Sequence, residues 1–296
     1  MVCLRYVIAL GGNAIAESGK VRGVAKAIAR LYARGDEVVV THGNGPQVGE
    51  LSDIESLRLP VLTAQTEAWI GTEIGNSIAA ALQSPAGSLR YSIPTVVLTY
   101  VIVRSGRKAF SNPTKPIGRF MEREEAEAMR SKGFAVRKLI HGYRRVVPSP
   151  NPKEIIQAGL IERLLRDRRI VIACGGGGIP MRRVSGRLEY ADAVIDKDRT
   201  SALLASEINA DRLIILTDVD GVYLDFSSKS RRLLRKASTS ELRKYAKAGY
   251  FEEGSMKPKV ESCIYFVDST KRDAAIGNIS RPEDAISMRN ATVITP

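Results

Sequence analysis

The chain has 296 residues, with 45 Lys and Arg against 32 Asp and Glu, and a formal net charge of +13. This length allows one large α/β domain or two lobes that bury roughly 75% of the unfolded surface. The three cysteines have no Cys-x-x-Cys spacing and the two histidines are far apart, which argues against a disulfide framework or a zinc site. No apolar run approaches the roughly 20 residues of a membrane span, and no signal-peptide pattern opens the sequence. We therefore expect a cytoplasmic protein with no membrane partner, and since its cations are scattered, no nucleic-acid partner.

Short β-rich runs alternate with helical stretches along the chain. We expect strands at 5–10, 37–41, 95–103, 170–174, 213–217 and 292–295, and helices at 25–34, 64–82 and 151–166. This alternation predicts an α/β fold, a three-layer αβα sandwich whose open, twisted sheet is mostly parallel. The segment from about 105 to 150 breaks the rhythm with four prolines and many charges, which predicts a lid or a small protruding subdomain.

Three glycine-rich turns follow predicted strands: GGN at 11–13, HGNGPQ at 42–47 and CGGGG at 174–178. Each one alone fits a simple tight turn. Together they place backbone amides at neighbouring strand ends, where α/β sheets bind anions. A P-loop is excluded because Ala14 and Val21 stand where glycine and Ser or Thr are required. His42 fits either a structural or a catalytic histidine.

Three lysines stand in unusual sequence contexts: Lys115 in NPTKPIG, Lys197 in IDKD and Lys259 in GSMKPKV. Each could be an ordinary surface lysine. However, prolines flank Lys115, and the other two stand where helices are expected to begin, which suits a jointly bound anion. Phosphoryl transfer requires mainly such positioning and charge stabilisation. The segment ILTDVDGVY fits either an Asp-Gly turn or a strand end that places Tyr223 beside an adenine.

Eight segments, ALGGNAI, THGNGPQVG, NPTKPIGRF, RRVVPSP, GGGGIP, AVIDKD, ILTDVDGVY and GSMKPKV, together closely resemble the carbamate kinases of the amino acid kinase family. The resemblance is ordered and spans most of the chain. It implies a carbamate-binding lobe at 1–205, including a subdomain at about 105–150 that carries Lys115, and a nucleotide-binding lobe at 206–296. It also implies a homodimer and the reaction ATP + carbamate ⇌ ADP + carbamoyl phosphate, with Mg²⁺ as a cofactor.

The same resemblance implies a role for individual residues. Lys115, Lys197 and Lys259 would offset charge in the transition state, and Asp198 would orient them. The other implied residues are Gly11, Gly12 and Asn13 around the transferred phosphoryl group; Gly43, Asn44, Gly45, Gly175 and Gly176 around carbamate; and Asp218, Tyr223 and Met256 around the nucleotide. No protein ligand for a metal is expected.

The residues themselves agree with this chemistry in one respect. The attacking oxygen of carbamate is already anionic at neutral pH, so no strong general base is needed, and the sequence offers no evident one. Two alternatives stay open: a related kinase that acts on another small acid, and a nucleotide- or anion-sensing protein that lacks turnover.

Overall fold

The computed structural model describes residues 3–11, 18–55, 57–82, 93–104, 110–139, 141–226, 231–252 and 255–296. Its centre is an eight-stranded sheet in the order β15-β17-β16-β12-β1-β2-β9-β3. Neighbouring strands are parallel throughout except for the antiparallel pair β16 and β17. The strands are β1 (Arg5–Leu10), β2 (Glu37–His42), β3 (Thr95–Val97), β9 (Val171–Ala173), β12 (Arg212–Thr217), β15 (Lys236–Ser238), β16 (Ala274–Asn278) and β17 (Thr292–Thr295).

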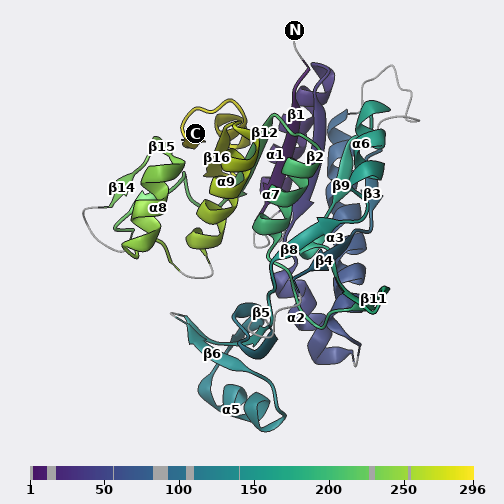
Figure 1. Cartoon of the computed structure of the whole chain (residues 1–296), viewed down its shortest axis with the longest axis vertical. Helices are drawn as coiled ribbons and strands as arrows, with labels where there is room; N and C mark the ends of the chain where they lie inside the picture. Colours follow the sequence, from purple (N-terminus) through teal and green to yellow (C-terminus); the bar gives the residue numbers. More distant parts are fainter. Residues whose placement is uncertain are drawn as a thin grey trace.

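Helices cover both faces of this sheet (Figure 1). One core cluster joins the sheet to α6 (Ala158–Arg166), α7 (Lys197–Glu207), α8 (Thr239–Lys247) and α9 (Met256–Thr270), and the other joins it to α1 (Ser18–Ala33), α3 (Leu59–Leu82) and α10 (Pro282–Ile286). Strand β1 is buried on both faces of the sheet: Val7 and Ala9 belong to the first cluster, and Tyr6, Ile8 and Leu10 belong to the second. A strand buried on both faces reads as a continuous apolar run. The predicted three-layer sandwich is confirmed.

Two sequence predictions of secondary structure are wrong in detail. The run 95–103 is two strands, because β3 ends at Val97 and β4 (Tyr100–Val103) joins a second sheet, β11-β10-β4-β8, with β10 (Ile179–Val184) and β11 (Arg187–Tyr190). The segment predicted as a helix from residue 151 begins instead with β8 (Pro152–Ile155), which pairs antiparallel with β4. Pairing with a distant strand decides the conformation there, and local periodicity carries no sign of it.

The segment predicted as a lid or subdomain is a small subdomain that stands off from the main body (Figure 1). It holds the antiparallel sheet β5-β7-β6 and one helix: β5 (Lys115–Met121), α5 (Arg123–Ser131), β6 (Val136–Leu139) and β7 (Gly142–Val147). It packs on α2 (Gly45–Ile54), where a Cβ on Gly49 would lie 2.0 Å from the Cα of Gly118. Such an approach requires glycine. Val48, Ile117 and Val147 form an apolar cluster at this junction.

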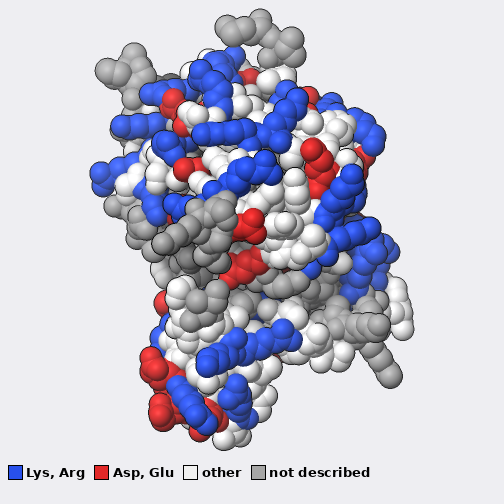
Figure 2. All heavy atoms as spheres, turned by 90° about the vertical axis from the view of Figure 1, so that its left-hand side faces the viewer, with Lys and Arg blue, Asp and Glu red and all other residues white. Residues whose placement is uncertain are grey.

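The remaining described elements are short: β13 (Tyr223–Leu224), β14 (Arg232–Leu233) and the 3-10 turn η3 (Gly175–Gly177). None of the helices in the described ranges is long and apolar enough to cross a membrane. Figure 2 shows Lys and Arg side chains spread over one face of the molecule, with Asp and Glu side chains among them. The absence of a nucleic-acid partner stays a prediction.

Candidate active site

A cavity of about 250 Å³ lies where β1, β2 and β12 end and where α7 and α9 begin. The carboxyl ends of parallel strands are the usual ligand-binding edge of an open α/β sheet. The subdomain contributes to the cavity as well, through β5 and β7. The lining residues are Gly11, Gly43, Asn44, Gly45, Pro46, Lys115, Pro116, Arg144, Gly176, Ile195, Asp196, Lys197, Asp198, Thr217, Asp218, Ser255 and Lys259.

Most of the residues singled out from the sequence meet in this cavity. Ten of them line it: Gly11, Gly43, Asn44, Gly45, Lys115, Gly176, Lys197, Asp198, Asp218 and Lys259. Gly175 is buried behind the wall, and neither Tyr223 nor Met256 belongs to the lining. Gly12 and Asn13 lie outside the described residues. The roles inferred from the resemblance stay predictions, as does the absence of a protein metal ligand.

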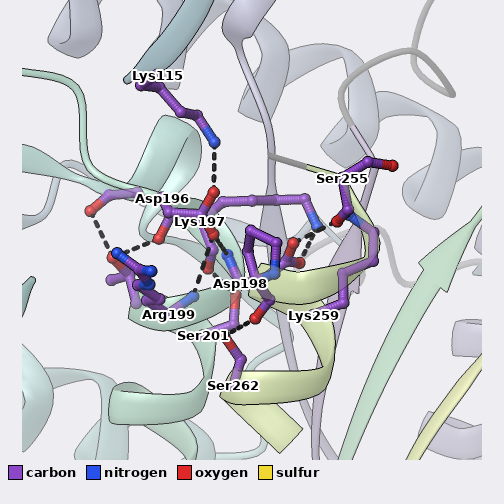
Figure 3. Close-up of polar contacts among 12 residues, drawn as sticks. Lys115, Asp196, Lys197, Asp198, Arg199, Ser201, Ser255, Lys259 and Ser262 are labelled. Atoms are coloured by element: carbon purple, nitrogen blue, oxygen red, sulfur yellow. Dashed lines mark hydrogen bonds and ion pairs between the residues drawn. The ribbon is translucent and has the colours of Figure 1, made fainter. Parts of the chain in front are cut away.

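Two carboxylates hold the three lysines in place (Figure 3). Asp196 caps α7 by accepting hydrogen bonds from the backbone N–H groups of Asp198 at 3.0 Å and Arg199 at 3.4 Å, and it also pairs with Lys115. The Nζ atoms of Lys197 and Lys259 lie 2.5 Å and 3.1 Å from the two carboxylate oxygens of Asp198. Three cations therefore face two anions, which leaves a net positive charge for an anionic ligand.

Asp196, Lys197 and Asp198 are buried, and Lys115 and Lys259 are half-buried. The ionisation of these side chains reflects both burial and pairing. Burial acts to raise the pKa values of Asp196 and Asp198, but the neighbouring lysines outweigh it and hold both pKa values below the usual range. Burial acts to lower the pKa of Lys259, yet the two aspartates raise it overall. Burial dominates at Lys197, with Lys259 acting in the same direction, so its pKa is lowered. The pairs keep the aspartates ionised, and Lys259 charged, at neutral pH.

Sequence reasoning missed two charged residues of the cavity, Asp196 and Arg144. The signal for Asp196 was the IDKD motif itself, since an Asp directly before a helix is a common N-cap. Arg144 lies in the quoted segment RRVVPSP, in β7, and no carboxylate pairs with it among the described residues. One guanidinium nitrogen donates to the Gly118 carbonyl oxygen, and its Nε is buried without a partner. Burial lowers the pKa of Arg144, and no opposing charge restores it.

The turn after β9 forms the opposite wall of the cavity, and it requires glycine. Gly176 has a φ of +64°, and a Cβ there would lie 2.2 Å from the side-chain nitrogen of Asn44. Asn44 in turn donates a hydrogen bond to the Thr66 hydroxyl of α3 at 2.9 Å. The amides of the turn and the Asn44 side chain thus form a fixed polar surface.

His42 lies behind this wall and is fully buried. Burial lowers its pKa to about 4, so its imidazole is neutral at physiological pH. It does not line the cavity. This is the structural alternative of the two that the sequence left open. Within the described part of the chain, no group of three or more His, Cys, Asp or Glu side chains could hold a metal ion.

Comparisons with known proteins cover the whole chain. The sequence matches the profile of the amino acid kinase family over residues 5–278. It is 40% identical to the carbamate kinase of Thermoplasma acidophilum over 98% of this chain and 99% of that protein. It is 39% identical to the carbamate kinase of Pyrococcus horikoshii over 99% of each chain. The structure of Giardia lamblia carbamate kinase bound to AMP-PNP has a TM-score of 0.83 to it at 33% identity, with 99% of both chains covered.

Proposed function

Since the chain belongs to the amino acid kinase family, and within it to the carbamate kinases, we propose that its cavity catalyses ATP + carbamate ⇌ ADP + carbamoyl phosphate. One observation carries the proposal beyond the family: Lys115, Lys197 and Lys259 come from three separate segments and converge on two buried carboxylates. A carbamate oxygen attacks the γ-phosphorus, and the bond from that phosphorus to the bridging oxygen of ADP breaks.

The lysines supply what this reaction asks of a protein. Charge develops on the oxygens of the moving phosphoryl group, and cations already in position stabilise it without reorganisation. We assign this role to Lys115, Lys197 and Lys259. Asp198 holds two of them and Asp196 the third, so each ammonium group is oriented before substrate arrives.

We propose the roles of the remaining residues from the resemblance to the family. We propose that Gly11 and the adjoining Gly12 and Asn13 cradle the phosphoryl group, and that Gly43, Asn44, Gly45, Gly175 and Gly176 form the carbamate pocket. We further propose that residues 206–296 hold the nucleotide through Asp218, Tyr223 and Met256, and that residues 1–205 hold carbamate. Support comes from Asp218, which directly follows β12, lines the cavity and pairs with Lys20 at 3.1 Å.

Mg²⁺ fits the site as a companion of the nucleotide. Mg²⁺ is commonly bound by one or two carboxylates together with substrate phosphates and water. Three carboxylates, Asp196, Asp198 and Asp218, line the cavity, and two of them already pair with its lysines. Asp218 is engaged as well, by Lys20 at 3.1 Å, so we propose that the nucleotide phosphates hold Mg²⁺ without a direct protein ligand. Bound Mg²⁺ would neutralise charge on the phosphates.

We also propose a cytoplasmic homodimer. Trp69 of α3 is 51% exposed and therefore not part of the core. Tyr100, Leu188 and Tyr190 of the second sheet are exposed as well. Sedimentation of the purified protein tests the dimer, and a monomer at micromolar concentration would contradict it.

The test of the reaction is ATP formation from ADP, Mg²⁺ and carbamoyl phosphate, with Lys115→Ala and Lys138→Ala compared with the intact protein. Lys138 is an exposed lysine of the same subdomain and serves as the control. Loss of one transition-state cation should lower kcat by about 10²- to 10³-fold in Lys115→Ala, with Lys138→Ala unchanged. Tight ADP binding with no ATP formed would favour the sensing alternative. Faster phosphorylation of aspartate or acetylglutamate than of carbamate would favour a related kinase.

A further inference from the structure

A buried carboxyl group lies behind the wall of the proposed carbamate pocket and takes no part in the lysine network. Glu67 of α3 is 1% exposed. Its Oε1 accepts a hydrogen bond from the Gly175 amide at 2.9 Å, and its Oε2 accepts one from the Thr99 amide at 3.2 Å. Gly175 follows β9, and Thr99 lies between β3 and β4, so one side chain joins two separate strand ends.

These contacts fix the wall from behind. Thr99 accepts a hydrogen bond from the Cys174 amide through its hydroxyl at 3.0 Å, so the start of the turn is tied at a second point. Thr66, the neighbour of Glu67 on α3, accepts from Asn44. One turn of α3 therefore positions both Asn44 and the glycine turn, the two surfaces that meet at Gly176.

In the described part of the chain, no cation compensates Glu67. Among the described residues no Lys or Arg forms an ion pair with it, and its hydrogen-bond partners are neutral groups, chiefly the backbone amides of Gly175 and Thr99. Burying an ionised carboxylate without a counter-charge is costly, and the usual outcome is protonation. Burial raises the pKa of Glu67 to about 8 against the opposing effect of those amides.

Of the other titratable groups near Glu67, His42 and Cys174 do not change charge in this range. Lys197 has a lowered pKa, and burial raises the pKa of Glu207, which acts on Cys174 by its charge, to about 7; both groups are present in every variant compared below. His42 of β2 has its pKa lowered to about 4 by burial. Burial raises the pKa of Cys174, at the end of β9, well above its usual value. Lys197 of α7 acts on His42 by its charge, and it belongs to the lysine network.

We propose that Glu67 is a positioning residue of the carbamate pocket. As a neutral acid, Glu67 ties the Gly175 and Thr99 amides together and so keeps negative charge away from the anion-binding wall. The inference rests on the proposed function. Ionisation of Glu67 would place a buried negative charge directly behind the glycine turn, where it repels carbamoyl phosphate. The nucleotide, which we assign to the other half of the cavity, would be less affected.

The test compares Glu67→Gln, Glu67→Ala and the intact enzyme by their KM values for carbamoyl phosphate and for ADP. The control is Glu73→Gln, which changes an exposed glutamate of the same helix. For the intact enzyme and the control, KM for carbamoyl phosphate should rise about threefold or more between about pH 7 and pH 9, while KM for ADP stays level. In Glu67→Gln, which is neutral at every pH, that rise should disappear.

Glu67→Ala removes both hydrogen bonds and should raise KM for carbamoyl phosphate about tenfold at pH 7, with a smaller effect on ADP. If the pH dependence of Glu67→Gln superimposes on that of the intact enzyme, the inference is wrong. If Glu67→Ala does not fold, the comparison with Glu67→Gln still decides the question.

Hydrogen exchange keeps this test separate from the test of the reaction. Amide exchange in the peptide that contains residues 174–178 should be faster in Glu67→Ala than in Glu73→Gln, and this is measurable even in a protein that forms no ATP. An inactive enzyme with this difference would refute the proposed reaction alone. Equal exchange rates would refute the positioning role.

Discussion

Replacing Arg144 with methionine should weaken substrate binding with little effect on stability. Arg144 lines the cavity, and none of the carboxylates that the structure describes pairs with it, so its removal leaves no buried anion behind. The loss is one hydrogen bond from a charged donor to the Gly118 carbonyl, worth about 1.5–3 kcal/mol, and the contact of the guanidinium with the Phe120 ring at 5.3 Å. Methionine retains much of the apolar packing, and a desolvated charge disappears. The net change in the free energy of unfolding should stay within about 1 kcal/mol.

The effect on binding should be larger. A hydrogen bond from a charged group to an anionic ligand is worth about 1.5–3 kcal/mol, which corresponds to roughly a ten- to hundredfold rise in KM. We expect this rise for carbamoyl phosphate, since Arg144 and Lys115 both line the cavity from the subdomain. The assay measures ATP formation at varied carbamoyl phosphate and fixed, saturating ADP, together with thermal unfolding.

Two comparisons make this result interpretable. Arg137→Met removes an exposed arginine of the neighbouring strand β6 and should change neither KM nor the unfolding temperature. Lys115→Met removes the nearest cation of buried Asp196 and should cost stability as well as activity. An unchanged KM in Arg144→Met, or a loss of stability as large as that of Lys115→Met, would refute the assignment of Arg144 as a charge kept free for the ligand.

Further predictions concern the glycine turn and the paired lysines. Gly176→Ala places a Cβ 2.2 Å from the side-chain nitrogen of Asn44 at a φ of +64°. ATP formation should therefore fall at least about tenfold, while the unfolding temperature drops only moderately. Full activity would contradict the assignment of Gly176 to the carbamate pocket. Asp198→Asn leaves Lys197 and Lys259 without their shared anion and should cost about 3–5 kcal/mol in denaturant unfolding; an unchanged midpoint would show that solvent compensates them. The pKa of Asp198 is lowered in the folded state, so its stabilisation is complete above its unfolded pKa of about 3.8 and is lost as the pH falls further. Stability measured between about pH 5 and 3 should therefore fall less steeply in Asp198→Asn than in the intact protein, and parallel curves would refute this.

The sequence determined much of the fold because the central strands are buried on both faces. Strand β1 has its predicted bounds, and β2 and β12 are each one residue longer than predicted. Continuous apolar runs predict such strands from the sequence alone. Strand β16 was missed. Its residues, Ala274–Asn278, are small and of low β-propensity, and only burial between neighbouring strands makes them a strand.

The candidate site could be predicted in part for a similar reason. Glycine turns and lysines at helix starts are local features, and the sequence named most of those that line the cavity. Arg144 and Glu67 carry no such local sign, because one lies in an ordinary β-strand and the other on the buried stripe of a long helix. Only the folded chain shows that, among the residues of the described ranges, Arg144 is a cation without a paired carboxylate and Glu67 a carboxyl group without a paired cation.

The amino-acid sequence by itself therefore determined the layer architecture, the protruding subdomain and the set of lysines, because these depend on periodicity, composition and short motifs. The tertiary structure alone decided which carboxylate holds which lysine, which charges stay unpaired, and what supports the glycine turn from behind. Those properties depend on distances between residues far apart in the chain, such as Lys115 and Asp196 or Glu67 and Gly175, and on how much water the fold removes from them.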